Sequence, residues 1–252
     1  MLTILVPVKD VSIHLRVKEG RLTRQGVPHR LDSLHETPLE WARRARESGL
    51  AARVVAMTLG PASAADALRR TLALGADEAI LVSDPAFEGA DVRTTARVIA
   101  AVAARVGAGL IACGYESADG SSGAVPGAVA GSLGWPLLSR AGLATVDGTS
   151  LTVTRDLGSG PERAAAPLPA VVSFVEGVIE PRVPTLREIM AVRSAGIATL
   201  SSADLGVRPA AANAVDAGVT AAPASRRTPT VLGFDDGVDS LVALLSGAGS
   251  DA

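Results

Sequence analysis

Four apolar runs alternate with amphipathic segments through the first half of the chain, and this alternation limits the fold more than any other feature. The runs occupy residues 2–8, 53–59, 79–82 and 110–113. Each run is continuously apolar, which is typical of parallel strands covered on both faces. Helices are predicted between them, over residues 34–47, 62–74 and 92–106, because apolar residues recur there with helical spacing. We therefore expect an α/β fold, a three-layer sandwich built on a mostly parallel, Rossmann-like sheet.

The pattern changes after residue 142, where short runs separated by turn residues replace the alternation. Strands are predicted over residues 143–146, 150–155 and 163–166, with glycine-containing turns between them. These strands predict an antiparallel hairpin extension over about residues 142–175. A further apolar strand is expected at 170–174, and Pro184 precedes a short helix at 185–192.

We divide the chain into an α/β nucleotide-binding domain, residues 1–200, and an extended C-terminal arm, residues 201–252. Residues 201–230 are poor in large apolar side chains, so they cannot bury enough area to fold by themselves. A short helix is predicted at the end of the arm, with one apolar face formed by Val238, Leu241, Val242 and Leu245. This helix is expected to dock, and the sequence leaves open whether it docks onto this chain or onto another subunit.

The run at 110–113 leads into the segment best suited to a ligand. Residues 114–123 are small and polar, and a helix rich in Ala, Gly and Val follows them and ends near Pro136. A helix N-terminus carries unpaired N–H groups and a partial positive charge, so it can bind an anion. Parallel sheets bind ligands beyond the carboxyl ends of their strands, where this loop lies. A nucleotide phosphate site and a ligand-free strand-to-helix connection are both compatible with this segment.

Charge and composition exclude several classes of function. The net charge is -2 and aromatic residues make up 2%, which argues against a nucleic-acid surface and against a stacking platform for bases. Cys113 is the only cysteine and lies in an apolar run, so it is expected to be a packed thiol. No apolar run approaches membrane-spanning length. With abundant Ala and Arg, these features predict a soluble, cytoplasmic, bacterial protein without membrane insertion.

The sequence contains no recognisable catalytic or metal-binding motif. The three histidines, His14, His29 and His35, lack the spacing of metal ligands, and no HExxH motif or Ser/His/Asp order occurs. A chain with a nucleotide-compatible edge, no catalytic motif and a tethered arm is expected to be a binding subunit.

Several ordered motifs resemble those of the electron transfer flavoprotein (ETF) beta-subunit family over almost the whole chain. The opening ILVPVK at 4–9 resembles the family's first strand and lysine, and Gly60-Pro61 followed by LRRTLALGAD at 68–77 resembles its GP…LRxALAMGAD stretch. LGWP at 133–136, LPAVV at 168–172 and DLGV at 204–207 match later family motifs. The run from EPR at 180–182 to Met190 resembles EPRxPxLPxIM. Ordered matches of this kind are far more specific than one loop motif.

The resemblance implies an electron carrier subunit without catalytic residues of its own. Family members form a heterodimer with an ETF alpha subunit that holds most of a redox-active FAD. They take electrons from flavin dehydrogenases and pass them to a downstream quinone reductase or other acceptor. The beta subunit usually buries a structural AMP, and a second FAD takes that place in bifurcating relatives. The alternative is a stand-alone adenine-nucleotide sensor or an ATP-using α/β protein, which would need neither a recognition helix nor a C-terminal arm.

The resemblance also implies which residues bind the cofactor and the partner. The cofactor-binding positions map onto Pro7, Asp32, Ser33, Leu34, His35, Leu59, Asp119, Gly120, Ser121, Ser122, Gly123, Ala124 and Val125. The partner-recognition segment, residues 180–195, contributes Pro184, Thr185, Leu186, Ile189, Met190 and Arg193, with Leu186 as the anchor. The residues alone leave a second interpretation of Leu186 open, in which it faces the core.

Three features of the sequence depart from the family pattern. Family members often have Asn-Pro where this chain has Asp32-Ser33, and Gln where it has Ala124, so amide groups that could meet a nucleotide are missing. Many members carry a lysine cluster after the recognition helix, but here residues 191–196 offer only Arg193. These departures concern the nucleotide and the choice of partner, and leave the predicted fold unchanged.

Overall fold

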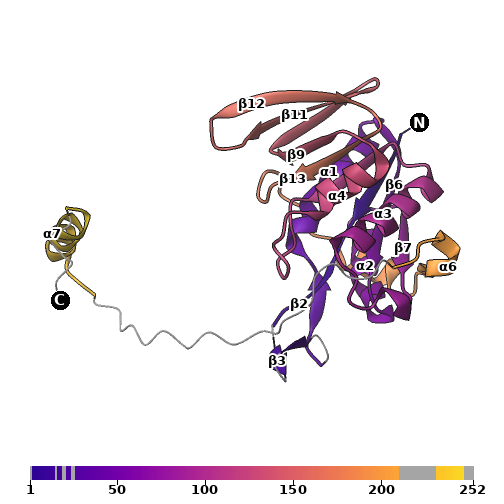
Figure 1. The fold of residues 1–252 in the computed structure, drawn as a ribbon, viewed down its shortest axis with the longest axis horizontal. Helices are drawn as coiled ribbons and strands as arrows, with labels where there is room; N and C mark the ends of the chain where they lie inside the picture. Colours follow the sequence, from indigo (N-terminus) through magenta and orange to yellow (C-terminus); the bar gives the residue numbers. More distant parts are fainter. Residues whose placement is uncertain (1, 15, 19–20, 24–25, 210–230, 247–252) are drawn as a thin grey trace.

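The computed structural model describes residues 2–14, 16–18, 21–23, 26–209 and 231–246. Its centre is a seven-stranded sheet in the order β14-β7-β6-β1-β8-β13-β9, in which every strand pair is parallel (Figure 1). The strands are β1 (Leu2–Pro7), β6 (Ala51–Leu59), β7 (Glu78–Val82), β8 (Leu110–Gly114), β9 (Leu137–Ala141), β13 (Ala170–Phe174) and β14 (Ala198–Leu200). The predicted α/β fold with a mostly parallel sheet is confirmed.

Side chains of the central strands alternate between two cores, one on each face of the sheet. On one face, Ile4 of β1 packs in a cluster with Leu39 of α1 (Glu36–Glu47) and Leu68 of α2 (Ala65–Ala73). On the other, Leu5 packs in a cluster with Val98 of α3 (Val92–Val106) and Val129 of α4 (Val125–Leu133). Burying one such side chain contributes about 1.5–3 kcal/mol. Helices therefore cover both faces, and the three-layer sandwich is confirmed.

Local capping sets the ends of the helices. Asp91 accepts a hydrogen bond from the N–H of Thr94 at 2.7 Å, and Gly107 ends α3 with a left-handed φ of 64°. The helix expected from residue 34 begins two residues later, because Ser33–His35 form a 3-10 turn, η1, that Asp32 caps. Two further 3-10 turns, η2 (Ala62–Ala64) and η3 (Pro85–Phe87), precede α2 and α3.

The predicted antiparallel extension is a separate three-stranded sheet. Strand β11 (Ser150–Asp156) lies between β10 (Leu143–Asp147) and β12 (Pro161–Pro167). Trp41 of α1 fixes this sheet to the domain, because its indole N–H donates to the carbonyl of Ala144 at 2.9 Å. The Trp41 ring also packs on Phe174 of β13, with 5.3 Å between the ring centroids.

The elements that were not predicted include β9, β14 and α6 (Ser202–Leu205), as well as two short strands near the N-terminus. Strand β9 contains Ser139 and Arg140, so its sequence lacks the apolar run that marks the other strands. Strand β14 has three residues and α6 has four, and both depend on tertiary partners. Ser202 donates to the carboxylate of Asp84 through its N–H at 2.9 Å and its hydroxyl at 2.6 Å.

The two ends of the chain carry additions to the sandwich. Near the N-terminus, β2 (Asp10–Ser12) pairs with β5 (His29–Leu31), and β3 (Arg16–Lys18) pairs with β4 (Arg21–Thr23). Near the C-terminus, the predicted helix is α7 (Phe234–Leu245), which stands apart from the α/β body in Figure 1. Residues 210–230 of the predicted arm lie outside the described part. Over the described ranges, no helix is long and apolar enough to cross a membrane.

Candidate functional site

The edge of the sheet at which β1 and β8 end is the candidate ligand site. Strands β6 and β7 extend the sheet on one side of β1, whereas β8 and β13 lie on its other side. The strand order therefore reverses between β1 and β8, and open α/β sheets bind ligands in the crevice beyond such a reversal. Pro7 ends β1 at this edge. The segment 115–124 leaves the end of β8 at the same edge and leads into α4.

Lys9 joins the connection that follows β1 to two other segments. Its ammonium group lies 2.5 Å from a carboxylate oxygen of Asp119 and 3.2 Å from the hydroxyl of Ser117. Its backbone N–H donates to Nδ1 of His35 at 2.9 Å. The side chain of Asp119 is almost completely buried, so Lys9 balances a carboxylate that water barely reaches. Sequence reasoning noted this lysine as a family feature but did not place it in the site.

Asp32 is a buried cross-link within the candidate site. One carboxylate oxygen accepts from the N–H of Leu34 at 3.1 Å, and the other accepts from the N–H of Ala118 at 2.8 Å. The carboxylate therefore holds η1 against the loop that follows β8, and charge-assisted hydrogen bonds of this kind are strong. Its backbone N–H also donates to the carbonyl of Lys9 at 3.0 Å. In this arrangement the carboxylate of Asp32 organises the loop.

His35 is buried beneath the same loop as a neutral ring. Burial lowers the pKa of His35 below its ordinary value, and this effect outweighs the carboxylate of Asp32, which raises it. Because Nδ1 accepts from Lys9, the proton of the neutral ring lies on Nε2. A Cβ atom at Gly114 would lie 2.3 Å from Cδ2 of His35 and 2.9 Å from the carbonyl oxygen of Leu34. Only glycine at position 114 allows η1 to approach the end of β8 this closely.

The loop between β8 and α4 presents backbone N–H groups at a helix start. Ser121 and Gly123 both adopt positive φ angles, 42° and 59°. The N–H of Ser121 donates to the carbonyl of Ser117 at 2.8 Å, and its hydroxyl donates to the same carbonyl at 3.2 Å. Ala124 precedes α4 and makes no side-chain cap, so no protein side chain satisfies the helix N-terminus from that position. The exposed loop can therefore offer N–H groups and the positive end of α4 to an anion.

Two residues that sequence reasoning missed support this loop. A Cβ atom at Gly123 would lie 3.4 Å from the ring of Tyr115, so the ring lies directly against the glycine. The guanidinium carbon of Arg140 lies 4.6 Å from the centroid of the same ring, a cation–π arrangement. Arg140 itself has a φ of 57°, and its N–H donates to the hydroxyl of Ser173 at 3.1 Å. No motif signalled either residue, because their contacts depend on the order of strands in the sheet.

The structure brings most of the predicted cofactor-binding residues to one edge. Pro7, Asp32–His35 and Asp119–Val125 meet through Lys9 and through the bond from Ala118 to Asp32. Leu59 ends β6 at the same edge and pairs with Val82 of β7, so it lies one strand further from β8. The individual roles of these residues remain predictions.

The predicted partner-recognition residues lie elsewhere, on α5 (Leu186–Val192) and directly before and after it, and this helix contacts α2. Pro184 is buried, whereas Leu186 is 74% exposed and Ile189 and Met190 are also exposed. Leu186 therefore faces outward and is not part of the core. Arg193, the cation that follows the helix, is exposed as well. The arrangement supplies a small apolar surface, and its role as a partner-recognition site remains a prediction.

Two further observations concern reactive and metal-binding side chains. Cys113 is buried at the end of β8, and burial raises its pKa to about 12, so the thiol stays protonated at neutral pH. Within the described ranges, no group of three or more His, Cys, Asp or Glu side chains is placed to hold a metal ion.

The fold and its edge define a parallel α/β protein of the Rossmann-like class. Residues 20–205 match the family described as the electron transfer flavoprotein domain. The chain is 33% identical over 220 residues to electron transfer flavoprotein subunit beta of Mycobacterium tuberculosis (strain ATCC 25618 / H37Rv), covering 84% of this chain and 83% of the relative. It is 34% identical over 213 residues to the Homo sapiens subunit of the same name, covering 82% and 84%. The chain therefore belongs to the family of electron transfer flavoprotein beta subunits.

Proposed function

We propose that this chain is the beta subunit of a heterodimeric electron transfer flavoprotein and acts as an electron carrier, not as an enzyme on its own. It pairs with an ETF alpha subunit that holds most of a redox-active FAD. The heterodimer accepts electrons from a flavin dehydrogenase and passes them to a quinone reductase or another acceptor. The observation that carries this proposal is membership of the beta-subunit family over most of the chain. FAD, when bound, supplies the electron chemistry.

The proposed second ligand is AMP, bound at the carboxyl edge of β1 and β8. The position at the strand-order reversal supports this proposal, as does the exposed loop that precedes α4. The backbone of residues 120–125 would hold the phosphate, and the ion pair of Lys9 with Asp119 fixes the same loop. A second FAD at this edge would instead indicate a bifurcating protein.

The proposed docking surface for the dehydrogenase is α5. Leu186, Ile189 and Met190 expose apolar side chains on one short helix, and exposed apolar anchors commonly dominate transient interfaces. The proposed surface does not include the nucleotide edge, so electron-donor docking and nucleotide binding should respond to different substitutions.

Co-expression with an ETF alpha subunit tests the proposed function. We expect a yellow one-to-one complex that releases FAD and AMP when it is denatured, as measured by absorbance and chromatography of the released nucleotides. A second FAD in place of AMP would support the bifurcating variant. A stable, colourless monomer that does not bind the alpha subunit would contradict the proposal and favour a stand-alone nucleotide-binding protein.

A further inference from the structure

Helix α5 is positioned without a buried face of its own. It has seven residues, and none of these described residues is buried. An isolated helix of this length is not stable in water, because nucleation costs more than a few hydrogen bonds return. The helix contacts α2, but none of its residues is buried there. Polar contacts at its first turn, and the buried Pro184 before it, therefore help to fix its direction.

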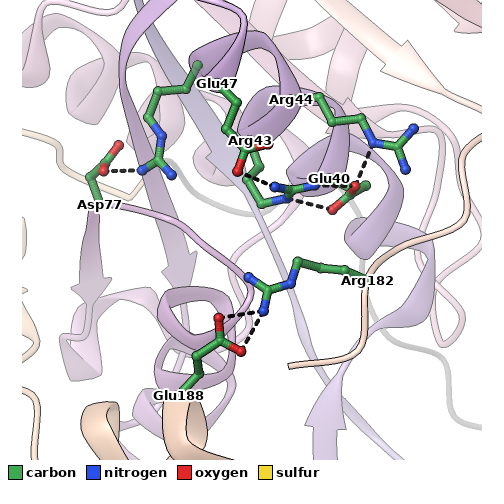
Figure 2. Close-up of polar contacts among 8 residues, drawn as sticks. Glu40, Arg43, Arg44, Glu47, Asp77, Arg182 and Glu188 are labelled. Carbon is green, nitrogen blue, oxygen red and sulfur yellow. Dashed lines mark hydrogen bonds and ion pairs between the residues drawn. The ribbon is translucent and has the colours of Figure 1, made fainter. Parts of the chain in front are cut away.

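One carboxylate provides most of these contacts. Glu188 accepts from the N–H of Thr185 at 2.7 Å and from its hydroxyl at 2.8 Å, and the N–H of Glu188 donates back to that hydroxyl at 3.3 Å. This reciprocal capping box closes the first turn of α5. The same carboxylate pairs with the guanidinium of Arg182, with 2.5 Å from Nη2 to either oxygen (Figure 2). Glu188 thus joins the helix to the chain that leads into it.

The chain before Arg182 is held in turn by α1. Glu40 has a side chain that is 3% exposed, and it accepts hydrogen bonds from Nε of Arg43 at 2.9 Å and from Nε of Arg44 at 2.6 Å. Arg44 then donates to the carbonyl of Glu180 at 3.3 Å. Figure 2 shows the group around Glu40 near the pair of Arg182 and Glu188. The segment from Glu180 to α5 is therefore fixed to the sandwich at its start and to the helix at its end.

We infer that Glu188 is a positioning residue for docking of the electron donor. Through Arg182 and Thr185 it holds α5 so that Leu186 and its apolar neighbours are presented together before the partner arrives. This inference rests on the proposed function, because it assumes that α5 is the docking surface. Preorganising an interface lowers the entropy that association must overcome, so Glu188 should affect affinity for the donor without touching it.

The test uses the complete heterodimer with FAD bound and a purified flavin dehydrogenase that reduces it. The variants are Glu188→Gln, Glu188→Ala, Leu186→Ala and the double variant with both alanines. Glu188→Gln keeps an oxygen for the capping box and loses the ion pair with Arg182. Glu78→Gln is the matched control, because it loses an exposed ion pair with Arg53, 3.0 Å apart, at the start of β7.

We expect Glu188→Ala to raise the KM for the heterodimer about 3- to 10-fold with little change in kcat, because weaker positioning reduces affinity. Glu188→Gln should have a smaller effect and Glu78→Gln none. In the double variant, loss of Glu188 should add almost nothing to the effect of Leu186→Ala, whereas effects on Tm should add. Amide hydrogen exchange at 186–190 should be faster in Glu188→Ala, and reduction of the flavin by dithionite should be unchanged.

Two results would overturn the inference. If Leu186→Ala raises the KM but both Glu188 variants leave it unchanged, Glu188 does not position the helix and the proposed docking surface stands. If Leu186→Ala also leaves the KM unchanged, the proposed docking surface is wrong, and the inference about Glu188, which rests on it, is wrong as well. Should Glu188→Ala fail to fold, the KM of Glu188→Gln and amide exchange at 186–190 in Glu188→Gln still decide between these outcomes.

Discussion

The carboxylate of Asp32 accepts a hydrogen bond from the backbone N–H of Ala118, 2.8 Å away and 86 positions along the chain. This bond joins the turn before α1 to the loop after β8. Because Asp32 also accepts from Leu34, one buried side chain fixes both sides of the candidate nucleotide edge. A long-range contact of this kind makes the loop part of the folded domain.

Replacing Asp32 with Asn should therefore destabilise the protein. The amide has one acceptor oxygen, so one of the two N–H donors would face an NH2 group and lose its partner. Leaving a buried donor unsatisfied costs about 1–3 kcal/mol in the free energy of unfolding, which urea titration measures. Asp66→Asn is the control, because that carboxylate is exposed and should change the free energy little. Equal effects of the two substitutions would contradict the cross-link.

The sequence predicted the fold more completely than it predicted this site. Continuous apolar runs marked β1, β6, β7, β8 and β13, because strands buried on both faces need apolar residues throughout. Strand β9 was missed because Arg140 interrupts its apolar pattern, and its pairing with β13 depends on tertiary context. The site depends on contacts such as that between Lys9 and Asp119, which become visible only when the order of strands is known.

Substitutions at Gly123 should separate the effect of charge from backbone strain. Gly123 has a φ of 59°, so any side chain there strains the backbone. Asn tolerates this conformation best and matches Asp in size, so Gly123→Asn is the control for Gly123→Asp. The negative charge of Asp should repel a phosphate at the loop. We expect the heterodimer with Gly123→Asp to lose its nucleotide and the one with Gly123→Asn to retain most of it, as measured in denatured samples. If both variants retain the nucleotide in full, the phosphate site does not lie at this loop.

Stability should fall as the solution becomes acidic below the ordinary pKa of histidine. Burial lowers the pKa of His35 below its ordinary value of 6.5. In the unfolded chain the ring takes up a proton near pH 6.5, whereas in the native state it resists protonation. The contribution of the neutral His35 ring to the free energy of unfolding is therefore complete above this pH. It is lost as the pH falls from 6.5 toward the lower native pKa. Urea titrations between pH 8 and pH 5 measure the slope of the free energy of unfolding against pH. His35→Gln should flatten it.

Leu186→Ala tests the docking surface separately from the fold. Because Leu186 is 74% exposed, its truncation should change the Tm little. Leu39, which is 1% exposed in α1, provides the contrast, since a buried Leu→Ala substitution costs about 2–5 kcal/mol. We expect Leu186→Ala to slow electron transfer from the dehydrogenase and to leave the flavin spectrum unchanged. A large fall in Tm with unaltered transfer would identify Leu186 as a structural residue.

The exposed face of α7 leads to the last prediction, which concerns assembly with the alpha subunit. Leu241 and Leu245 are 55% and 77% exposed, and no described residue of α7 is buried. Apolar side chains one helical turn apart on such a face are suited to a groove on another subunit. Truncation after Pro209 keeps the carbonyl of Arg208, which accepts from Arg97 at 3.0 Å, so the sandwich should remain intact.

We expect this truncation to weaken binding of the alpha subunit without changing the Tm of the isolated chain. Leu241→Ser with Leu245→Ser should raise the Kd for the alpha subunit about tenfold or more, because each leucine would bury apolar area on binding. Ser240→Ala is the control from the neighbouring position and should leave the Kd unchanged. Calorimetric titration of the alpha subunit measures all three. An unaltered Kd in the truncated chain would show that α7 takes no part in assembly and that residues 1–209 contain the complete interface.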